Sequence, residues 1–372
     1  MSRHLTAVDG PPGVGKTTRI IERAAAGELD AVITYGNDAA RVLLDRAPGI
    51  TAGTVYSLTW RAGASKFSKA TGRGRRSAAP HKERAITAAH DPALDRYVRE
   101  APSRRRTKPD LLRLQVLIHS WDGTGEPDFD LAETAEKVKH EIALARWLAE
   151  GAPFADDFDG FSSIALDESQ DFSRLELASA MALLRPGGRA WAYGDPGQSI
   201  YGEAKGMVGD ALPAAWDRAD ARELMVGGRR CGDPLASAAT QVLAPYWSRP
   251  AASFTVEGRL SEVLPWDIMD APARGLVLGY SRKTVENWFV KWGLRETCVA
   301  PNLDDPDRNL VLCTAHAAKG AEADDVYLLP NKAFTKRVAD REPGALRLAY
   351  VAMTRARRRF FAPRSFLAVL PK

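Results

Sequence analysis

The sequence predicts an α/β fold with parallel sheets, because short apolar runs alternate with helix-like segments along the chain. The apolar runs cover residues 5–8, 31–34, 164–166, 190–193, 276–279, 310–314 and 326–329. The clearest helix-like segments cover residues 130–150, 175–184 and 235–244. Polar loops follow most of the runs. Open α/β sheets bind ligands at such loops, so the functional residues are sought there.

Length and composition are those of a globular protein with room for two domains. The chain has 372 residues, of which 45% are hydrophobic and 27% charged. Cys231, Cys298 and Cys313 are too widely spaced for a metal site or a disulfide framework, which predicts a reducing compartment. No apolar run approaches the ~20 residues of a membrane span, so we expect a cytoplasmic protein with no membrane partner. The net charge of +5 and the pI of about 9.1 are compatible with a polyanionic partner.

The first functional motif is a glycine-rich loop after the first apolar run. It reads Gly10, Pro11, Pro12, Gly13, Val14, Gly15, Lys16 and Thr17, and Thr18 continues into a helix-like run. This is the pattern G-x-x-x-x-G-K-[ST] in its strand–loop–helix context, which predicts nucleotide phosphate binding. Backbone N–H groups and the helix N-terminus would face the phosphates. Lys16 would reach the β and γ phosphates, and Thr17 would hold Mg²⁺. The alternative is a glycine-rich turn with an exposed lysine.

A second motif lies at the end of the run at 164–166, where two acids follow in sequence. Asp167 would hold Mg²⁺ through water, opposite Thr17, and Glu168 would act as the general base on the attacking water. An exposed acidic loop, or a helix N-terminus enriched in acids, would look the same in isolation. The phosphate loop upstream makes ATP hydrolysis the favoured interpretation.

Residues 61–140 differ in character from the rest and are predicted to be a short basic insertion. Two arginine clusters, at residues 73–76 and 104–106, lie among Ser, Pro and Ala residues. Such clusters are compatible with contacts to nucleic-acid phosphates, and equally with a solvated surface.

Ordered along the chain, these and further segments resemble the motifs of the UvrD/Rep-like superfamily 1A DNA helicases. Residues 34–40 (TYGNDAA) resemble T-F-T-N-K-A-A, and residues 53–58 (GTVYSL) resemble G-T-F-H-S-L. Residues 167–171 (DESQD) and 194–201 (GDPGQSIY) resemble D-E-x-Q-D and G-D-x-x-Q-S-I-Y. Residues 314–322 (TAHAAKGAE) and 350–356 (YVAMTRA) resemble T-x-H-x-x-K-G-x-E and Y-V-A-x-T-R-A. Each match alone could be chance, but the ordered set identifies the chain as similar to this family.

The resemblance implies two RecA-like parallel-sheet motor domains of the P-loop NTPase class, which close around Mg²⁺ and ATP. We expect them at residues 1–222 and 223–372, with the insertion at 61–140. Gln198 would sense the γ-phosphate, and Arg355 would act as an arginine finger. A second arginine would be Arg229 or Arg230, since the register of that motif is ambiguous by one residue. Gly320 and Glu322 would lie at the nucleotide, with Glu322 at the ribose.

Nucleic-acid contacts are also implied, and the expected partner is single-stranded DNA, including single-strand/duplex junctions. The candidate residues are Tyr35, Gly36, Asn37, Thr54, Tyr56, Ser57, Tyr201, Thr314 and His316. Aromatic faces would stack on bases and hydroxyl groups would bond phosphates, although Tyr56 and Tyr201 could instead fill the core. The forms of the segments at 194–201 and 314–322 favour the 3′→5′ branch of the family. A monomer with a replication, recombination or repair partner protein is expected.

The chain departs from the family pattern in two ways. No glutamine precedes Gly10, and the aromatic residue that usually covers adenine is replaced by Gly228 or Arg229, so base selectivity is open. Only about 80 residues lie between Arg230 and Thr314, where family helicases carry a further large domain. The leading hypothesis is an ATP-dependent DNA helicase or translocase. The rivals are a translocase that unwinds only with a partner, a nucleotide-switched binding module, and a motor with RNA as its track.

Overall fold

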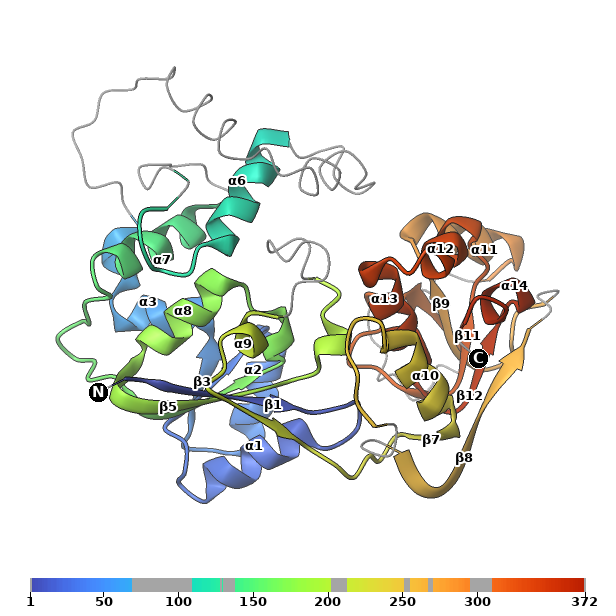
Figure 1. Ribbon diagram of the computed structural model, residues 1–372, viewed down its shortest axis with the longest axis horizontal. Helices are drawn as coiled ribbons and strands as arrows, with labels where there is room; N and C mark the ends of the chain where they lie inside the picture. Colours follow the sequence, from blue (N-terminus) through green and yellow to red (C-terminus); the bar gives the residue numbers. More distant parts are fainter. Residues whose placement is uncertain are drawn as a thin grey trace. The chain divides into compact units, whose positions relative to one another are not determined.

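The computed structural model describes residues 2–68, 109–127, 129, 138–201, 213–250, 255–266, 270–294 and 310–370. The chain folds into two compact units (Figure 1). The N-terminal unit comprises Met1–Asp9, Lys16–Gly194 and Tyr201–Glu223. The C-terminal unit comprises Leu224–Lys372 together with two short loop segments, Gly10–Gly15 and Asp195–Ile200.

The N-terminal unit is a six-stranded sheet with helices on both faces. Its strands are β1 (His4–Asp9), β2 (Ala31–Thr34), β3 (Thr51–Thr54), β4 (Phe161–Asp167), β5 (Leu184–Gly194) and β6 (Ala221–Leu224). Its helices are α1 (Lys16–Ala25), α2 (Asn37–Arg46), α3 (Val55–Ala62), α6 (Pro109–Ser120), α7 (Lys139–Ala149), α8 (Arg174–Ala182) and α9 (Ala214–Asp217). In Figure 1, α1 lies on one face of the sheet, and α3, α7 and α8 lie on the other.

Strand order in this sheet places the predicted motifs at one edge. The order is β3-β2-β4-β5-β1-β6, and the four pairs from β3 to β1 are parallel. Carboxyl ends of parallel strands meet at the same edge of a sheet, which is where open α/β sheets bind ligands. The phosphate loop follows β1, Glu168 follows β4, and Asp195 follows β5. Chain topology therefore gathers Gly10 and Asp195, which are 185 residues apart in sequence.

The C-terminal unit is built on a second six-stranded sheet, of order β10-β9-β11-β12-β8-β7, in which all five neighbouring pairs are parallel. The strands are β7 (Cys231–Pro234), β8 (Thr255–Pro265), β9 (Gly275–Gly279), β10 (Leu310–Thr314), β11 (Ala323–Leu328) and β12 (Ala356–Ala362). The helices are α10 (Leu235–Leu243), α11 (Arg282–Lys291), α12 (Lys332–Ala339), α13 (Pro343–Met353) and α14 (Arg364–Leu367).

Alternation along β9 divides the core of this unit into two layers. Leu276 and Leu278 pack with residues of α10, α12 and α13, whereas Val277 packs with Val285 of α11. Successive side chains of a strand point to opposite faces, so these helices cover opposite faces of the sheet. Trp288 and Trp292 are partly buried and pack against the α11 layer.

The predicted fold class, α/β with two parallel-sheet domains, is confirmed. All seven apolar runs form strands, and the segments at 175–184 and 235–244 form α8 and α10. The helix expected at 130–150 is described from Lys139 to Ala149 as α7. Strands β3, β6, β7, β8 and β12 were not expected from the sequence. In β12 the reason is charge: Arg359 forms two hydrogen bonds of 2.7 and 2.6 Å with Asp325 of β11, and this cross-strand pairing is invisible in a one-dimensional pattern.

Part of the basic insertion has a described structure. It includes α6, an unexpected helix, and the first residues of α7, while both arginine clusters at 73–76 and 104–106 lie outside the described residues. Cys298 also lies outside them. Across the part of the chain that is described, no helix combines the length and apolar character needed to cross a membrane.

Candidate nucleotide and nucleic-acid site

The phosphate loop joins the end of β1 to the first residue of α1. Gly13 and Gly15 have φ angles of +74° and +89°, a region that side chains with a Cβ rarely adopt. A Cβ on Gly13 would also lie only 2.7 Å from the Cβ of Arg230. Both glycines are therefore needed for this loop conformation. Helix α1 begins at Lys16, so its first backbone N–H groups are available to a phosphate.

Thr17 and Asp167 bring the two nucleotide motifs together in the N-terminal unit. The Thr17 hydroxyl donates a hydrogen bond of 3.2 Å to Oδ2 of Asp167, and the Glu168 N–H donates one of 3.0 Å to Oδ1. Burial raises the pKa of Asp167 to about 6, and the charge of Glu168 acts in the same direction, whereas Lys16 and Thr17 act in the opposite one. A buried carboxylate beside a like charge favours a bound cation.

These oxygens fit the coordination chemistry of Mg²⁺. The ion prefers hard oxygen ligands and is usually held by one or two protein groups plus phosphates and water. A hydroxyl and a carboxylate at hydrogen-bonding distance provide that partial set. Among the described residues no cluster of three or more His, Cys, Asp or Glu could hold a metal by itself, so the rest of the shell would come from the nucleotide and water.

Glu168 occupies an uncommon backbone conformation at the end of β4. Its φ of 54° and ψ of 37° are left-handed, which costs free energy in a residue other than glycine and is enriched at functional sites. Nε2 of Gln170 donates a hydrogen bond of 2.6 Å to Oε2 of Glu168. Gln170 therefore orients the carboxylate of Glu168. Gln170 is part of the sequence motif at 167–171, but the motif alone did not indicate this role.

Arg355 and Gln198 are in direct contact in the C-terminal unit. The Arg355 guanidinium donates to Oε1 of Gln198 at 3.3 Å and to the carbonyls of Val351 and Ala321 at 3.1 and 3.3 Å. Only 1% of Arg355 and 5% of Gln198 are exposed. Arg355 is therefore a buried residue and not an exposed surface arginine.

The two arginines of the ambiguous register have different environments. Arg230 donates from Nε to Glu322 at 2.6 Å and from Nη1 to the Thr354 carbonyl at 3.3 Å. Arg229 has an exposed side chain, and its backbone N–H donates to the Gly13 carbonyl at 3.0 Å. Arg230 is therefore the residue whose guanidinium is fixed near Arg355, while Arg229 is anchored only through its backbone in the contacts described.

Glu322 connects two arginines next to this position. Arg357 lies 3.0 Å from its Oε1, and Arg230 holds its Oε2. Burial alone would raise the pKa of Glu322, but the charges of Arg230 and Arg357 outweigh burial and lower the pKa. The lowered pKa favours the ionised form of Glu322, whose carboxylate oxygens are hydrogen-bond acceptors.

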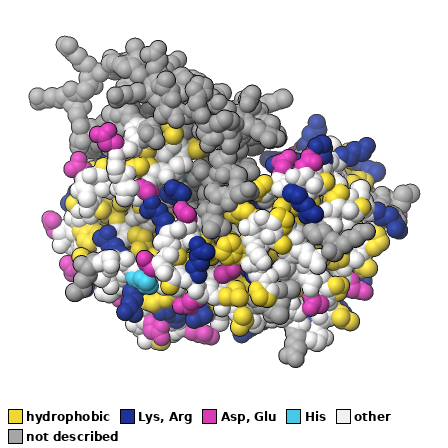
Figure 2. Space-filling view, viewed as in Figure 1, with side chains coloured by type: hydrophobic (Ala, Val, Ile, Leu, Met, Phe, Trp, Pro, Cys, Tyr) yellow, Lys and Arg dark blue, Asp and Glu magenta, His cyan; other side chains and the backbone are white. Residues whose placement is uncertain are grey.

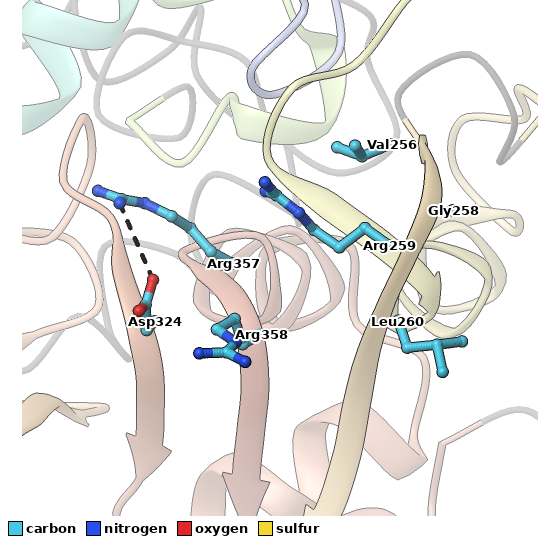
Figure 3. A pocket seen from close by; sticks show the side chains of 7 residues that line it. All are labelled: Val256, Gly258, Arg259, Leu260, Asp324, Arg357 and Arg358. Atoms are coloured by element: carbon cyan, nitrogen blue, oxygen red, sulfur yellow. Dashed lines mark ion pairs between the residues drawn. The ribbon is translucent and has the colours of Figure 1, made fainter.

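A cavity of about 780 Å³ opens beside Arg357, between β8 and β12. In Figure 3, the side chains of Arg259 and Arg357 extend in the same direction from neighbouring strands, and Arg357 lies 3.9 Å from Asp324. The Arg259 guanidinium also donates to the carbonyls of Arg229 and Arg230, at 3.4 and 3.2 Å. Neither Arg259 nor Arg357 was singled out from the sequence, because neither belongs to a recognised motif. Arg259 lies in β8, and Arg357 is the first of three consecutive arginines in β12.

Tyr35 and Tyr201, two of the expected base-stacking residues, stack on one another in the N-terminal unit. Their ring centroids are 6.1 Å apart and their planes differ by 8°. Tyr35 follows β2 and is 41% exposed, and Tyr201 is half-buried. The two tyrosines are therefore not core residues. They form a partly exposed pair of stacked rings.

The candidates that follow β3 already have intramolecular roles. The Thr54 hydroxyl caps α3 by accepting the Ser57 N–H at 3.2 Å, and the Ser57 hydroxyl donates to the Thr54 carbonyl at 2.9 Å. Tyr56 packs edge-on against His140. Burial, followed by the charge of Glu176, raises the pKa of Tyr56 well above its usual value. Of these three residues, Tyr56 has the environment that best fits the alternative in which its ring fills the core and does not stack on a base.

The remaining candidates lie at the starts of helices or turns. Gly36 is the N-cap of α2 and its carbonyl accepts the Thr34 hydroxyl at 2.8 Å, and Asn37 is the first helical residue. In the C-terminal unit Thr314 accepts the Ala317 N–H at 3.2 Å, and burial lowers the pKa of His316. His316 is therefore neutral near pH 7, and any contact with nucleic acid would use its ring rather than a charge.

Basic side chains are also visible away from these motifs. Figure 2 shows Lys and Arg together with Asp and Glu over α11 and α12. Arg282 and Lys336 are 90% and 76% exposed and pair with Glu286 and Asp340 one turn away. This surface is partly neutralised by its own acids, so it offers less attraction to a polyanion than its arginines and lysines alone would suggest.

Comparisons with known proteins give only distant structural matches. No protein-family model matches the chain, and no curated protein sequence matches it. The chain is similar to arterivirus nonstructural protein 10, a helicase, with a TM-score of 0.45 and 15% identity over 99% of this chain and 62% of that one. It is similar to the PRRSV helicase with a TM-score of 0.46 and 14% identity over 98% and 54%. A complex of the arterivirus protein with DNA gives a TM-score of 0.44 and 15% identity over 98% and 62%.

These matches carry no inference about activity at such low similarity. The chain spans less than two thirds of the length of each of these helicases. Function is therefore inferred from the residues of this chain.

Proposed function

We propose that this chain is an ATP-dependent nucleic-acid motor of helicase superfamily 1. It would couple Mg²⁺-dependent ATP hydrolysis to 3′→5′ movement along single-stranded DNA, and it would belong to the UvrD/Rep-like branch. The observation that carries the proposal is the hydrogen bond between Thr17 and Asp167, which unites two nucleotide motifs 150 residues apart. A chance glycine-rich turn and a chance acidic loop would have no reason to meet at the carboxyl ends of two parallel strands.

The chemistry follows from the side chains of the N-terminal unit. Lys16 and the first N–H groups of α1 would bind the phosphates, with Thr17 and Asp167 holding Mg²⁺, which neutralises phosphate charge when bound. Glu168, oriented by Gln170, would accept a proton from the attacking water. A carboxylate held at 2.6 Å by an amide donor is a fixed acceptor, and fixed geometry is a large part of catalysis in phosphoryl transfer.

The C-terminal unit would supply the positive charge that the transition state needs. Arg355 is the proposed finger, and Gln198 the proposed γ-phosphate sensor. The contact between them supports a shared role, because a ligand phosphate that attracts Arg355 must change the hydrogen bonding of Gln198. Arg230 is favoured over Arg229 as the second arginine, since its guanidinium is fixed by Glu322.

The track is proposed to be single-stranded DNA, gripped without sequence preference. The stacked pair of Tyr35 and Tyr201 supports this, because bases stack on aromatic faces whatever their identity, at about 1–3 kcal/mol per base. Lys319 connects the proposed strand-binding segment to the proposed γ-phosphate sensor, since its ammonium donates to the Gln198 carbonyl at 3.2 Å. The segment at 314–322 that would touch the strand thus contacts the proposed γ-phosphate sensor.

The direct test is steady-state ATP hydrolysis with and without single-stranded DNA. We expect hydrolysis that requires Mg²⁺ and rises on addition of single strands. Glu168→Gln purified in parallel is the matched control, because it keeps the shape of the site and exposes any contaminating ATPase. If wild-type hydrolysis does not exceed this control, the proposed motor activity is refuted. If hydrolysis does not change on addition of any nucleic acid, a nucleotide-switched module is favoured.

A translocase that unwinds duplex only with a partner is the second candidate. The short spacing between Arg230 and Thr314 favours it, since little chain remains for a duplex-engaging domain. Strand displacement on duplexes with a 3′ or a 5′ tail separates the candidates. Unwinding of the 3′-tailed substrate alone supports a 3′→5′ helicase. DNA-stimulated hydrolysis without any unwinding supports the translocase, and RNA in place of DNA tests the track.

A further inference from the structure

The carboxylate of Asp195 is the centre of a buried hydrogen-bond network in the C-terminal unit. Asp195 is fully buried, and four donors surround it. The Arg249 guanidinium and the Gly197 N–H contact Oδ1, the latter at 2.9 Å. The Tyr350 hydroxyl and Nε2 of Gln198 contact Oδ2, each at 3.0 Å. Such a network specifies one arrangement, because an unpaired member would carry the full cost of burial.

This network decides which way the Gln198 amide points. Because Nε2 donates to Asp195, Oε1 must be on the opposite side, where it accepts Nη2 of Arg355 at 3.3 Å. A rotated amide would place its NH₂ group against the guanidinium, and two donors would then face each other. The proposed sensor therefore presents its oxygen to the proposed finger while the Asp195 carboxylate accepts from Nε2 on the other side.

Arg249 provides the charge that keeps this carboxylate inside the protein. Its side chain is 3% exposed and that of Asp195 is 0% exposed, so each needs the other. Arg249 follows α10 and lies outside every motif segment described above. Gly197, whose N–H donates to the same carboxylate, is closely packed, since a Cβ there would lie 2.3 Å from Leu243 and 2.9 Å from Tyr350.

We propose that Arg249 is a positioning residue for ATP hydrolysis: it neutralises Asp195, which in turn orients the Gln198 amide toward Arg355. Arg249 does not touch the nucleotide in this scheme, and it acts through two intermediates. The proposal rests on the proposed ATPase function. It extends that function by assigning a role to a residue 51 positions from Gln198 in the sequence.

The central variant is Arg249→Met, which keeps most of the side-chain length and removes the charge. We expect a fall in kcat of roughly tenfold to a hundredfold with little change in the KM for ATP, because a misplaced group costs rate more than ground-state binding. Arg249→Lys restores the charge without the planar fork and should recover part of the rate. Tyr350→Phe removes a single donor to Asp195 and should lower kcat by a smaller factor, with a smaller fall in melting temperature than Arg249→Met.

Arg359→Met is the matched control for destabilisation. Arg359 pairs with Asp325, whose side chain is 4% exposed, so this variant also leaves a buried carboxylate without its arginine in the same unit. It has no described contact with Gln198 or Arg355. We expect Arg359→Met to lower the melting temperature while it retains the wild-type kcat of its folded fraction.

The double variant Arg249→Met with Asp195→Asn separates positioning from folding. Removing both charges should restore the melting temperature relative to Arg249→Met, while kcat stays low because the carboxylate that orients Gln198 is gone. Recovery of wild-type kcat in the double variant would overturn the proposal, as would folded Arg249→Met with wild-type kcat. If neither variant folds, Tyr350→Phe decides, and an unchanged kcat there overturns the proposal. Absence of ATPase in the wild-type protein would instead refute the underlying function.

Discussion

The candidate site residues of the two units arrange their charges in opposite ways. In the N-terminal unit, Asp167 and Glu168 place two carboxylates side by side, and burial together with this repulsion raises the pKa of Asp167 to about 6. In the C-terminal unit, charges and strong hydrogen-bonding groups occur as compensated sets: Asp195 with Arg249, Glu322 with Arg230 and Arg357, and Gln198 with Arg355. One unit concentrates like charges at its site, and the other balances opposite charges internally.

Under the proposed function, the N-terminal residues bind the nucleotide and metal, and the C-terminal residues exchange partners when the nucleotide binds. Like charges at the end of β4 favour a cation and the phosphates that accompany it. Buried pairs must exchange partners before they can act on a ligand, so their energetics are tied to the folded structure. We therefore expect substitutions in the N-terminal set to change turnover alone, and substitutions in the C-terminal set to change turnover and stability together.

Lys16→Ala should have the largest effect on turnover of the N-terminal set. Loss of a phosphate contact should reduce ATP hydrolysis by at least ~100-fold, and circular dichroism and the melting temperature should stay at wild-type values because Lys16 opens α1 at the surface. Retained hydrolysis in this variant would contradict the assignment of the phosphate loop, whatever its stability.

Arg355→Ala tests the C-terminal set. The loss in kcat should approach the roughly 10³-fold that an arginine finger provides, with a much smaller change in ATP affinity. Unlike Lys16→Ala, it should also destabilise the fold by about 1–3 kcal/mol, because the buried carbonyl of Val351 and the half-buried carbonyl of Ala321 each lose a donor. Chemical denaturation and binding of a fluorescent nucleotide measure the two effects separately. Equal losses in turnover and affinity would argue against the finger.

Arg229→Ala and Arg230→Ala form a natural pair, because the residues are adjacent and only the Arg230 guanidinium is held by Glu322. We expect Arg230→Ala to lower kcat and to leave Glu322 with Arg357 as its remaining arginine partner. Arg229→Ala should mainly raise the KM for ATP by a few-fold, if its side chain covers the base. Steady-state kinetics on both variants measure the changes in kcat and KM. GTP as a second substrate tests whether the effect of Arg229→Ala depends on the base. Identical behaviour of the two variants would remove the distinction drawn from their environments.

Tyr35→Ala should have the smallest and most selective effect. Losing one stacking face should weaken single-strand affinity by about 1–3 kcal/mol, and DNA stimulation of the ATPase should fall with it. Basal hydrolysis and melting temperature should be nearly unchanged, since Tyr35 is 41% exposed. Titration of labelled oligonucleotides at several salt concentrations is the measurement. Unfolding without a selective DNA defect would mean that the pair with Tyr201 is structural.

Much of the fold was predictable because buried parallel strands leave a continuous apolar signal. The seven predicted runs are all strands, and the residues directly after β1, β4 and β5 carry the nucleotide motifs. Strands β8 and β12 were not predictable in the same way. Glycine and charged residues interrupt their apolar pattern, and Arg359 of β12 is neutralised by an acid from the neighbouring β11. A single sequence does not show which strands will be neighbours.

The sequence by itself determined the chemistry of the candidate site, because a phosphate loop and an acid pair are local patterns whose spacing sets their geometry. Glycines with positive φ, a helix that starts at Lys16, and two acids at a strand end need only their immediate neighbours. Only the tertiary structure decided how the candidate residues of the C-terminal unit are arranged. Gln198 meets Arg355 across 157 residues, and Asp195 is held by Arg249 and Tyr350 from separate parts of the chain. Buried ion pairs and amide orientations are properties of packing in three dimensions, and no local pattern encodes them.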